Sequence, residues 1–334
     1  MKNNCFSYKD SSMAFLFAIF VYFALSFVFS QFLVSYSLAN NVEVSSLFSQ
    51  NWVIYINALL GEVGYLIVFL VFSKRKKVNV FACKREDRLR VNTTILTILI
   101  ASVLFFASIN FVLMFENIFS TFSTPPNGRI PLSNIGELLL SILCFALMPA
   151  VCEELLFRGI IFKSLNKKFG LVLSVILGSI IFVLIHFSIY QTIYQFLLGI
   201  ALCLILYFTG NILYCIIAHF TNNLIVLLIN YFAKNDTILQ FNNWGVKEVI
   251  LSILFLLIGI AVICFIFSII RKQKQEYQKL EEDYEQHGQE YIGEEKNIND
   301  NNVQNKNGDS LANFAYIATM IFCLIIWITN SFGG

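Results

Sequence analysis

Residues 135–157 read IGELLLSILCFALMPAVCEELLF, and Arg158 follows directly. Apart from Glu137, no charged side chain precedes Glu153 in this stretch. A helix needs about 20 mostly apolar residues to cross the ~30 Å hydrocarbon layer of a bilayer, so the stretch predicts a membrane-spanning helix. It ends on Glu153, Glu154 and Arg158, and ionisable groups inside such a segment are costly and usually mark function or a buried partner.

The whole chain has the composition of a membrane protein. Of its 334 residues, 57% are hydrophobic and 13% are charged, whereas soluble domains run at about 45–50% apolar and about 25% charged. The net charge of +2 is too small to indicate nucleic acid as a partner. The eight cysteines form no Cys-x-x-Cys pair or zinc-like spacing, so we expect reduced, apolar core residues.

Similar apolar runs occur throughout the chain, and we expect an all-α, polytopic transmembrane helical bundle of about nine spans. The fourth span is expected to continue past Arg158 towards Leu165. The spans are predicted at residues 13–34, 52–73, 91–115, 135–157, 171–187, 192–208, 212–232, 249–270 and 311–331. The segments are then three N-terminal spans in 1–134, a core of spans in 135–232, span eight in 233–270, a polar linker in 271–310 and a last span in 311–334.

Lys and Arg side chains gather in alternate connections between the spans. They occupy residues 74–90, 163–168 and 271–274, whereas 35–51 has none and 116–134 has only Arg129. Short cytoplasmic loops carry an excess of Lys and Arg, so we expect the N-terminus in the cytoplasm and the C-terminus outside. The polar segment 271–310 is expected to begin as a charged helix and to continue as a disordered cytoplasmic linker.

The charged end of the fourth span divides into two parts. Glu154 and Arg158 are four residues apart and share one helix face, so an ion pair there would hold Arg158 and keep Glu154 ionised. Glu153 points about 100° away and has no cation in its own helix. Such a carboxylate suits proton uptake and release near neutral pH. The alternative interpretation is a solvated cytoplasmic end of the span.

Two of the three histidines, His186 and His219, lie in apolar spans. His186 follows Phe182 by four residues, and Asn223 follows His219 by four, so each pair shares a helix face. A single membrane histidine is more often a hydrogen-bonded packing residue, but two together with Glu153, Glu154 and Arg158 favour a functional site.

Together these residues are a complete set for hydrolysis. Glu153 can activate a water molecule, and His186 can hold that water or ligate a metal that does. His219 and Asn223 can donate hydrogen bonds to a developing oxyanion. A zinc ion, if one is used, would take Glu153, His186 and His219 as ligands, and a metal-free glutamate mechanism is equally open. The chain contains no His-Glu-x-x-His or Gly-x-Ser-x-Gly motif.

Glu62 is a further carboxylate inside an apolar span, the second one. It has no basic partner in its own helix. We interpret it as a structural residue that forms an interhelical hydrogen bond, and a supporting role behind the site is the alternative.

Three motifs follow one another on successive predicted helices: Glu-Glu-x-x-x-Arg at 153–158, Phe-x-x-x-His at 182–186 and His-x-x-x-Asn at 219–223. This order resembles the CAAX protease and bacteriocin-processing (CPBP, or Abi) family, which includes the type II CAAX prenyl endopeptidases. The resemblance covers roughly residues 135–232. It implies an all-helical membrane peptidase with a water-filled cavity that opens to the cytoplasm.

The resemblance also implies roles for the matching positions. Glu153 and His186 would activate water, and His219 and Asn223 would form the oxyanion hole. Glu154 and Arg158 complete the first motif and join the candidate catalytic set. Members of the family are often labelled metalloproteases, so the resemblance leaves both the zinc and the metal-free mechanisms open.

We therefore expect an intramembrane endopeptidase that hydrolyses a peptide bond of a membrane-anchored or lipidated protein or peptide. The Asn/Lys/Ile-rich composition is typical of bacteria, so the bacterial plasma membrane is the expected location, with the lipid bilayer and an anchored substrate as partners. The alternatives are a proton-coupled membrane transporter and a non-catalytic membrane scaffold. No two-fold internal repeat, a frequent transporter feature, is visible.

Overall fold

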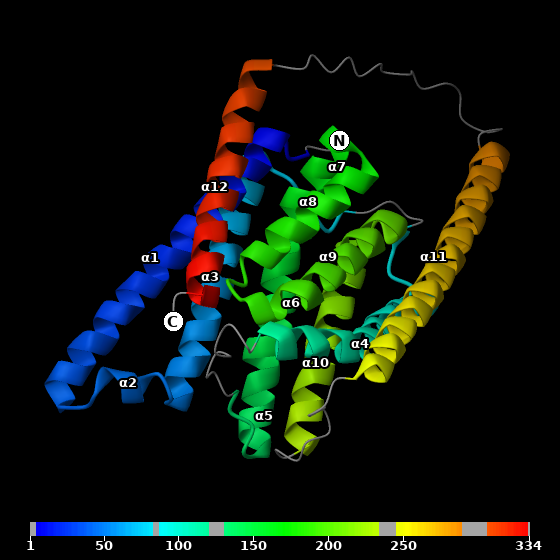
Figure 1. Ribbon diagram of the computed structural model, residues 1–334. Coiled ribbons are helices and arrows are strands. Elements are labelled where there is room, and N and C mark those ends of the chain that lie inside the picture. The colour runs from blue at the N-terminus through cyan, green and yellow to red at the C-terminus, as the bar shows by residue number, and fades with distance from the viewer. Residues whose placement is uncertain (1–4, 83–86, 120–129, 234–244, 289–305, 333–334) are drawn as a thin grey trace.

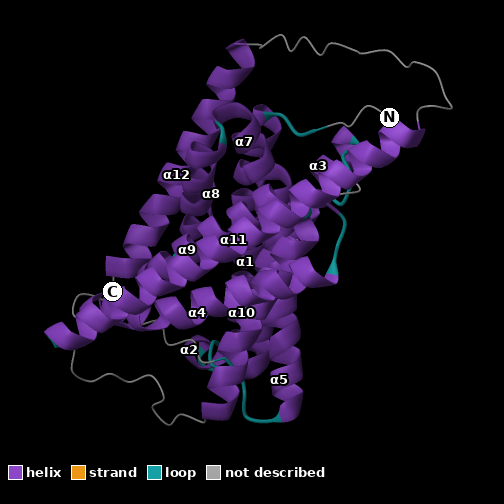
Figure 2. Ribbon diagram, turned by 90° about the vertical axis from the view of Figure 1, so that its right-hand side faces the viewer, coloured by secondary structure: helices purple, strands orange, loops and turns teal. Residues whose placement is uncertain are grey.

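The computed structural model describes residues 5–82, 87–119, 130–233, 245–288 and 306–332. Within these ranges the chain is helical and forms no strand, which confirms the predicted all-α membrane bundle (Figures 1 and 2). Eight helices of the described ranges are long and apolar enough to cross a membrane. They are α1 (Tyr8–Asn40), α3 (Asn51–Lys76), α4 (Val91–Phe119), a composite helix (Ile135–Phe169), α9 (Ile189–Thr209), α10 (Ile212–Ala233), α11 (Val246–Gly288) and α12 (Lys306–Phe332).

The composite helix carries the Glu-Glu-x-x-x-Arg motif, and it continues past Arg158 as predicted. It consists of α5 (Ile135–Ser141), η2 (Ile142–Leu147), α6 (Met148–Glu153), η3 (Glu154–Phe162) and α7 (Lys163–Phe169). Asn134 caps its start by accepting a hydrogen bond from the amide of Glu137. Both η segments are π-helical, a wider winding that occurs frequently at functional sites.

Pro149 accounts for the change of winding in the middle of this helix. It stands at the start of α6, directly after the first π-helical segment. Proline has no amide hydrogen, so it cannot donate to the carbonyl of Phe145 four residues earlier. The Phe145 carbonyl, about two turns before the two glutamates, is therefore open to another donor.

The fifth predicted span, residues 171–187, differs from the structure. The helix there is α8 (Leu171–Leu184), whose 14 residues extend for about 21 Å at 1.5 Å per residue. That is too short to cross a ~30 Å hydrocarbon layer upright. The chain leaves the helix at residues 185–188, where Phe187 has a left-handed φ of 48°, and returns as α9 packed against α8. Composition could not reveal this end, because the apolar residues continue through it.

The predicted linker at 271–310 also differs in part. Its first portion is helical as expected, but it continues α11 without a break to Gly288. The expected disordered portion falls mainly on residues 289–305, outside the described ranges. The last helix begins at Lys306 rather than at the predicted residue 311.

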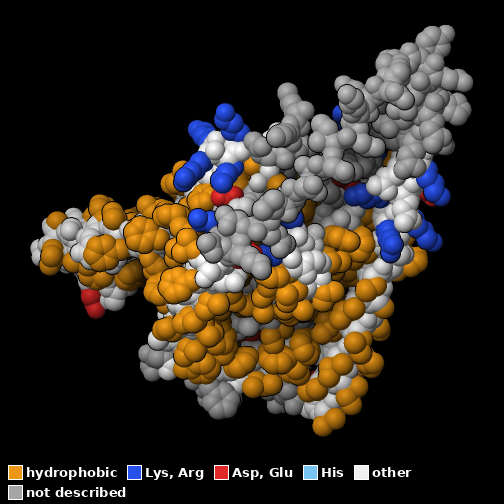
Figure 3. All heavy atoms as spheres, turned by 90° about the horizontal axis from the view of Figure 1, so that it is seen from above, with side chains coloured by type: hydrophobic (Ala, Val, Ile, Leu, Met, Phe, Trp, Pro, Cys, Tyr) orange, Lys and Arg blue, Asp and Glu red, His pale blue; other side chains and the backbone are white. Residues whose placement is uncertain are grey.

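One end of the bundle collects the basic residues, which agrees with the predicted Lys/Arg pattern; Lys84, Arg85 and Arg129 lie outside the described ranges. Figure 3 looks down on this basic end and shows Lys and Arg side chains there, with hydrophobic side chains on the flanks. Ion pairs join the helices at this end. They are Lys76–Asp10 at 2.8 Å, Lys168–Asp309 at 2.9 Å and Lys274–Asp87 at 2.6 Å.

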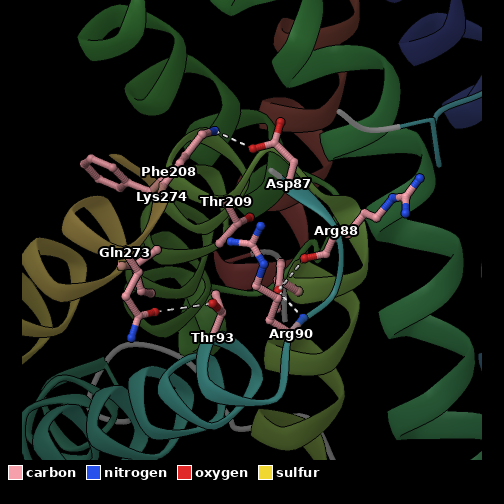
Figure 4. Close-up of a pocket in the computed structure, with 10 residues that line it drawn as sticks. Asp87, Arg88, Arg90, Thr93, Phe208, Thr209, Gln273 and Lys274 are labelled. Carbon is pink, nitrogen blue, oxygen red and sulfur yellow. Dashed lines mark hydrogen bonds and ion pairs between the residues drawn. The ribbon is translucent and has the colours of Figure 1, made fainter. Parts of the chain in front are cut away.

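A small pocket at the basic end is separate from the three motifs. It lies between the start of α4, the end of α9 and the middle of α11 (Figure 4). Lys274 points at Asp87, and Gln273 points at Thr93 across it. Next to it, the Arg90 guanidinium lies 3.3 Å from the centre of the Tyr277 ring. These contacts fasten α11 to the bundle.

Candidate active site

A carboxylate with two nitrogen partners is the centre of the candidate site. Oε1 of Glu154 lies 2.8 Å from Nη1 of Arg158 and 2.9 Å from Nδ1 of His219. All three side chains are buried. The predicted ion pair between Glu154 and Arg158 is therefore present, and it extends to a histidine from α10.

Arg158 is 1% exposed, so its charge needs partners inside the bundle. Besides Glu154, its Nη2 donates to the carbonyl of Gly199 on α9 at 3.4 Å. Its guanidinium carbon lies 4.2 Å from the centre of the Phe182 ring, a cation–π contact. Arg158 thus connects the composite helix to α8 and α9 and organises the site without facing solvent.

Glu153 has a different environment from its neighbour. It is 6% exposed, and its Oε2 lies 4.0 Å from Nε2 of His219, beyond hydrogen-bond distance. The two glutamates therefore flank opposite nitrogens of one imidazole ring. Because Glu154 occupies Nδ1, the neutral ring carries its hydrogen there and presents a bare Nε2 towards Glu153.

Glu62 lies beside the candidate site, although the sequence favoured a purely structural role for it. It lies on α3, is 7% exposed and is in hydrogen-bond contact with Glu153. Two ionised carboxylates repel each other in such surroundings, so a hydrogen bond between them forms only when one of the two carries a proton. In the sequence, Glu62 stands out because it lies in an apolar span without a basic partner. Only the packing of α3 on α6 shows that its neighbour is Glu153.

His186 lies in the turn between α8 and α9, at the end of the short helix. Its Nδ1 donates to the carbonyl of Phe182 at 2.8 Å, which fixes the ring and leaves Nε2 as an acceptor. The Phe182 ring packs edge-on against both histidine rings, with centroid distances of 5.0 Å to His186 and 5.9 Å to His219. Phe182 is thus the apolar contact that brings the second and third motifs together.

Asn223 binds the free acceptor that Pro149 creates. Its Nδ2 donates to the Phe145 carbonyl at 3.3 Å. Its Oδ1 accepts from Nδ2 of Asn222 at 3.2 Å, and Oδ1 of Asn222 accepts from the Tyr194 hydroxyl. A side-chain amide has two hydrogens, so Asn223 keeps one donor for another group. Asn222 and Tyr194 belong to none of the three motifs, so neither was predicted as a site residue.

The candidate metal ligands do not form a metal site in this arrangement. No group of three His, Cys, Asp or Glu side chains in the described ranges is placed to hold an ion. His219 uses Nδ1 for Glu154, and His186 uses Nδ1 for a backbone carbonyl. Each ring still has its Nε2, and a histidine whose Nδ1–H is hydrogen-bonded is the usual form of a metal ligand, so the zinc and metal-free mechanisms both stay predictions. No chemical step is assigned to a metal.

The fold and the site define an all-helical membrane protein with a buried polar centre of the kind that hydrolytic enzymes use. The three predicted motifs meet around Phe182, His219 and Glu154, although they come from separate helices. Residues 135–225 match the family model described as "Type II CAAX prenyl endopeptidase Rce1-like". This match confirms the predicted resemblance over that part of the chain and supports a CAAX-type intramembrane endopeptidase in general. No curated protein and no solved structure matches the chain.

Proposed function

We propose that this protein hydrolyses a peptide bond of a membrane-anchored or lipidated substrate with a water molecule activated by Glu153 and His186. The observation that carries the proposal is the unequal pairing of the adjacent glutamates. Glu154 is neutralised by Arg158 and bonded to His219, whereas Glu153 has neither contact. A carboxylate that is not held by a cation can take a proton from water.

The remaining groups support the later stages of such a reaction. Nε2 of His186 is free to accept a hydrogen bond from the attacking water. When Glu153 has taken the proton, the tetrahedral oxyanion needs donors. The second amide hydrogen of Asn223 is one. Glu154 holds Nδ1 of His219 and so fixes that ring beside Glu153. Glu153 then returns the proton that it took from water to the leaving amine.

The basic end suggests the side from which substrate arrives. Short cytoplasmic segments are rich in Lys and Arg, and α3, α7 and α11 carry theirs at the same end. We assign this end to the cytoplasm, so the substrate would be cleaved from a segment on that side. Prenylated proteins are one candidate class. In a bacterial membrane, the maturation of a peptide or the clipping of an anchored signalling protein fits better.

The test is a cleavage assay on the purified full chain in liposomes. It would compare wild type, Glu153→Ala and His186→Ala against a library of lipidated and membrane-anchored peptides. We expect cleavage by wild type alone, and the same cleavage after treatment with a chelator. Equal cleavage by all three proteins would refute the assigned site, and loss of cleavage with the chelator would refute the metal-free step.

A further inference from the structure

The turn that carries His186 has an unfavourable backbone conformation. Phe187, the next residue, has a φ of 48° and is 8% exposed. The left-handed region costs a residue with a side chain about 1–2 kcal/mol, because Cβ approaches the carbonyl oxygen. Such a conformation persists only where surrounding contacts impose it. The orientation of His186 therefore depends on whatever holds residues 185–188.

The last helix, α12, supplies polar contacts on both sides of the turn. Nδ2 of Asn330 donates to the carbonyl of Phe187 at 3.4 Å. Nε1 of Trp327 donates to Oγ1 of Thr192 at 2.9 Å, and that hydroxyl donates to the carbonyl of Ser188 at 2.9 Å. The two carbonyls that directly follow His186 thus depend on α12, one directly and one through Thr192.

The Phe187 ring is also held between the first and last helices. It packs against Tyr22 and Phe23 of α1, with centroid distances of 5.8 and 5.6 Å. Phe23 in turn packs edge-on against Phe322 of α12 at 5.4 Å. At the basic end, the hydroxyl of Tyr8 donates to Asn313, which joins the same two helices again.

We propose that Trp327 and Asn330 of α12 are positioning residues that hold the 185–188 turn and thereby orient the imidazole of His186. The match to the family model ends at residue 225, so α12 lies outside it. No role in the site was predicted for this last span. The effect on catalysis rests on the proposed function, whereas the effect on His186 does not.

The first experiment reads the histidine directly. The chain has three histidines, so nitrogen NMR of ¹⁵N-histidine-labelled protein gives few ring signals, and His186→Gln assigns one set. We would compare Asn330→Leu, Trp327→Phe and the double variant with the control Thr329→Ala. Thr329 is exposed on the same helix and bonds only its own helix carbonyl, that of Ile326.

We expect the ring signals of His186 to shift or broaden in the positioning variants and to stay unchanged in Thr329→Ala. Trp327→Phe keeps an aromatic ring, so it serves as the test if Asn330→Leu does not fold. Unchanged His186 signals in the double variant, or an equal change in the control, would overturn the proposal.

The second experiment measures kinetics with a cleaved substrate. Small misplacements of a catalytic group can cost about a hundredfold in rate. We therefore expect a tenfold or larger fall in kcat in the double variant with KM almost unchanged, whereas general loosening of the bundle would also alter KM. If the variants shift the His186 signals but wild type cleaves no substrate, the positioning role stands and the proposed function is refuted. An unchanged kcat despite shifted signals would overturn the catalytic part.

Discussion

The Nδ1 atom of His219 lies 2.9 Å from Oε1 of Glu154, so the third motif is bonded directly to the first. The same oxygen also binds Arg158 at 2.8 Å. This shared oxygen gives the two adjacent glutamates different tasks. Glu154 fixes a cation and a histidine, and Glu153 stays available on the other side of the imidazole, 4.0 Å from Nε2.

Replacing Glu153 with glutamine is expected to remove activity and to leave the fold intact. The amide has nearly the shape of the carboxyl group but cannot accept the proton of water, so kcat would fall about 10²- to 10⁴-fold. The unfolding temperature in detergent is expected to stay the same or rise, because a buried carboxylate without a cation is removed. Cleavage rates and thermal unfolding on one preparation measure both. Retention of full activity would show that Glu153 is not the base.

Replacing Glu154 with glutamine is expected to act mainly on stability. It leaves the charge of Arg158 buried without a carboxylate, and breaking a buried ion pair from one side costs about 3–5 kcal/mol. We therefore expect a clearly lower unfolding temperature than in Glu153→Gln, measured under the same conditions. If both variants have the stability of wild type, Arg158 does not depend on Glu154 and the division of tasks is wrong.

The contact between Glu62 and Glu153 gives a third prediction. The proton between them can be supplied by a glutamine N–H at position 62, whereas leucine has similar volume and no donor. We expect Glu62→Gln to keep most of the activity and Glu62→Leu to lose about tenfold or more, because Glu153 loses its orienting partner.

Thermal unfolding distinguishes an effect of Glu62 on the orientation of Glu153 from an effect on the packing of the bundle. Burial of an apolar side chain in place of a carboxyl group does not weaken the bundle, so Glu62→Leu is expected to unfold no earlier than wild type. Full activity of Glu62→Leu would assign Glu62 to structure alone, as its sequence context first suggested.

The sequence predicted correctly those features that depend on residue spacing within one helix or on the length of an apolar run. Four-residue spacing predicted the Glu154–Arg158 pair, and the pair is present. Apolar length predicted the bundle and the continuation of the fourth span. The contact of Asn223 with the Phe145 carbonyl, four residues before Pro149, was not predicted and required the structure.

The sequence was less informative where packing decides. The end of α8 lies among apolar residues, and no local signal distinguishes Leu184 from the residues after it. The turn is set by contacts to Phe187 from α1 and α12, which are remote in the chain. Glu62, Asn222 and Tyr194 reach the site for the same reason. Their partners lie on other helices, and the catalytic roles of the motif residues stay predictions.

Close contact of α8 and α9 gives a fourth prediction. A Cβ at Gly199 would lie 3.0 Å from both Cα and Cβ of Ser179, so backbone would have to move. A Cβ at Gly178, on the other helix of the pair, would meet nothing nearer than Cys203 Sγ at 3.5 Å. We expect Gly199→Ala to lower the free energy of unfolding by about 1–3 kcal/mol, and Gly178→Ala to change it by less than about 0.5 kcal/mol.

Activity should follow the same order, because the Gly199 carbonyl accepts from Nη2 of Arg158. Displacement of α9 would move this acceptor and loosen the guanidinium. Unfolding in detergent and cleavage rates, measured on both alanine variants, check the pair. Equal stability of the two variants would show that the helices adjust to the added methyl group without cost.

The hydrogen-bonded chain from Tyr194 to Asn223 gives the last prediction. The Tyr194 hydroxyl donates to Asn222, whose amide donates to Asn223 at 3.2 Å. Tyr194→Phe removes one hydroxyl and leaves the amides with one restraint fewer. A hydrogen bond contributes about 0.5–1.5 kcal/mol net, so we expect kcat to fall up to about tenfold with KM almost unchanged. Tyr207→Phe is the control, because Tyr207 lies on the same helix and is 45% exposed.

The double variant Tyr194→Phe/Asn223→Ala shows whether the two residues act together. Loss of an oxyanion donor costs about 10²–10³ in kcat, so Asn223→Ala alone is expected to be severe. If Tyr194 acts only through Asn223, adding Tyr194→Phe to Asn223→Ala changes kcat no further. If the fall in kcat of the double variant equals the product of the two single falls, Tyr194 acts on the reaction independently of Asn223. Asn223 would then be oriented by Phe145 and Asn222 alone.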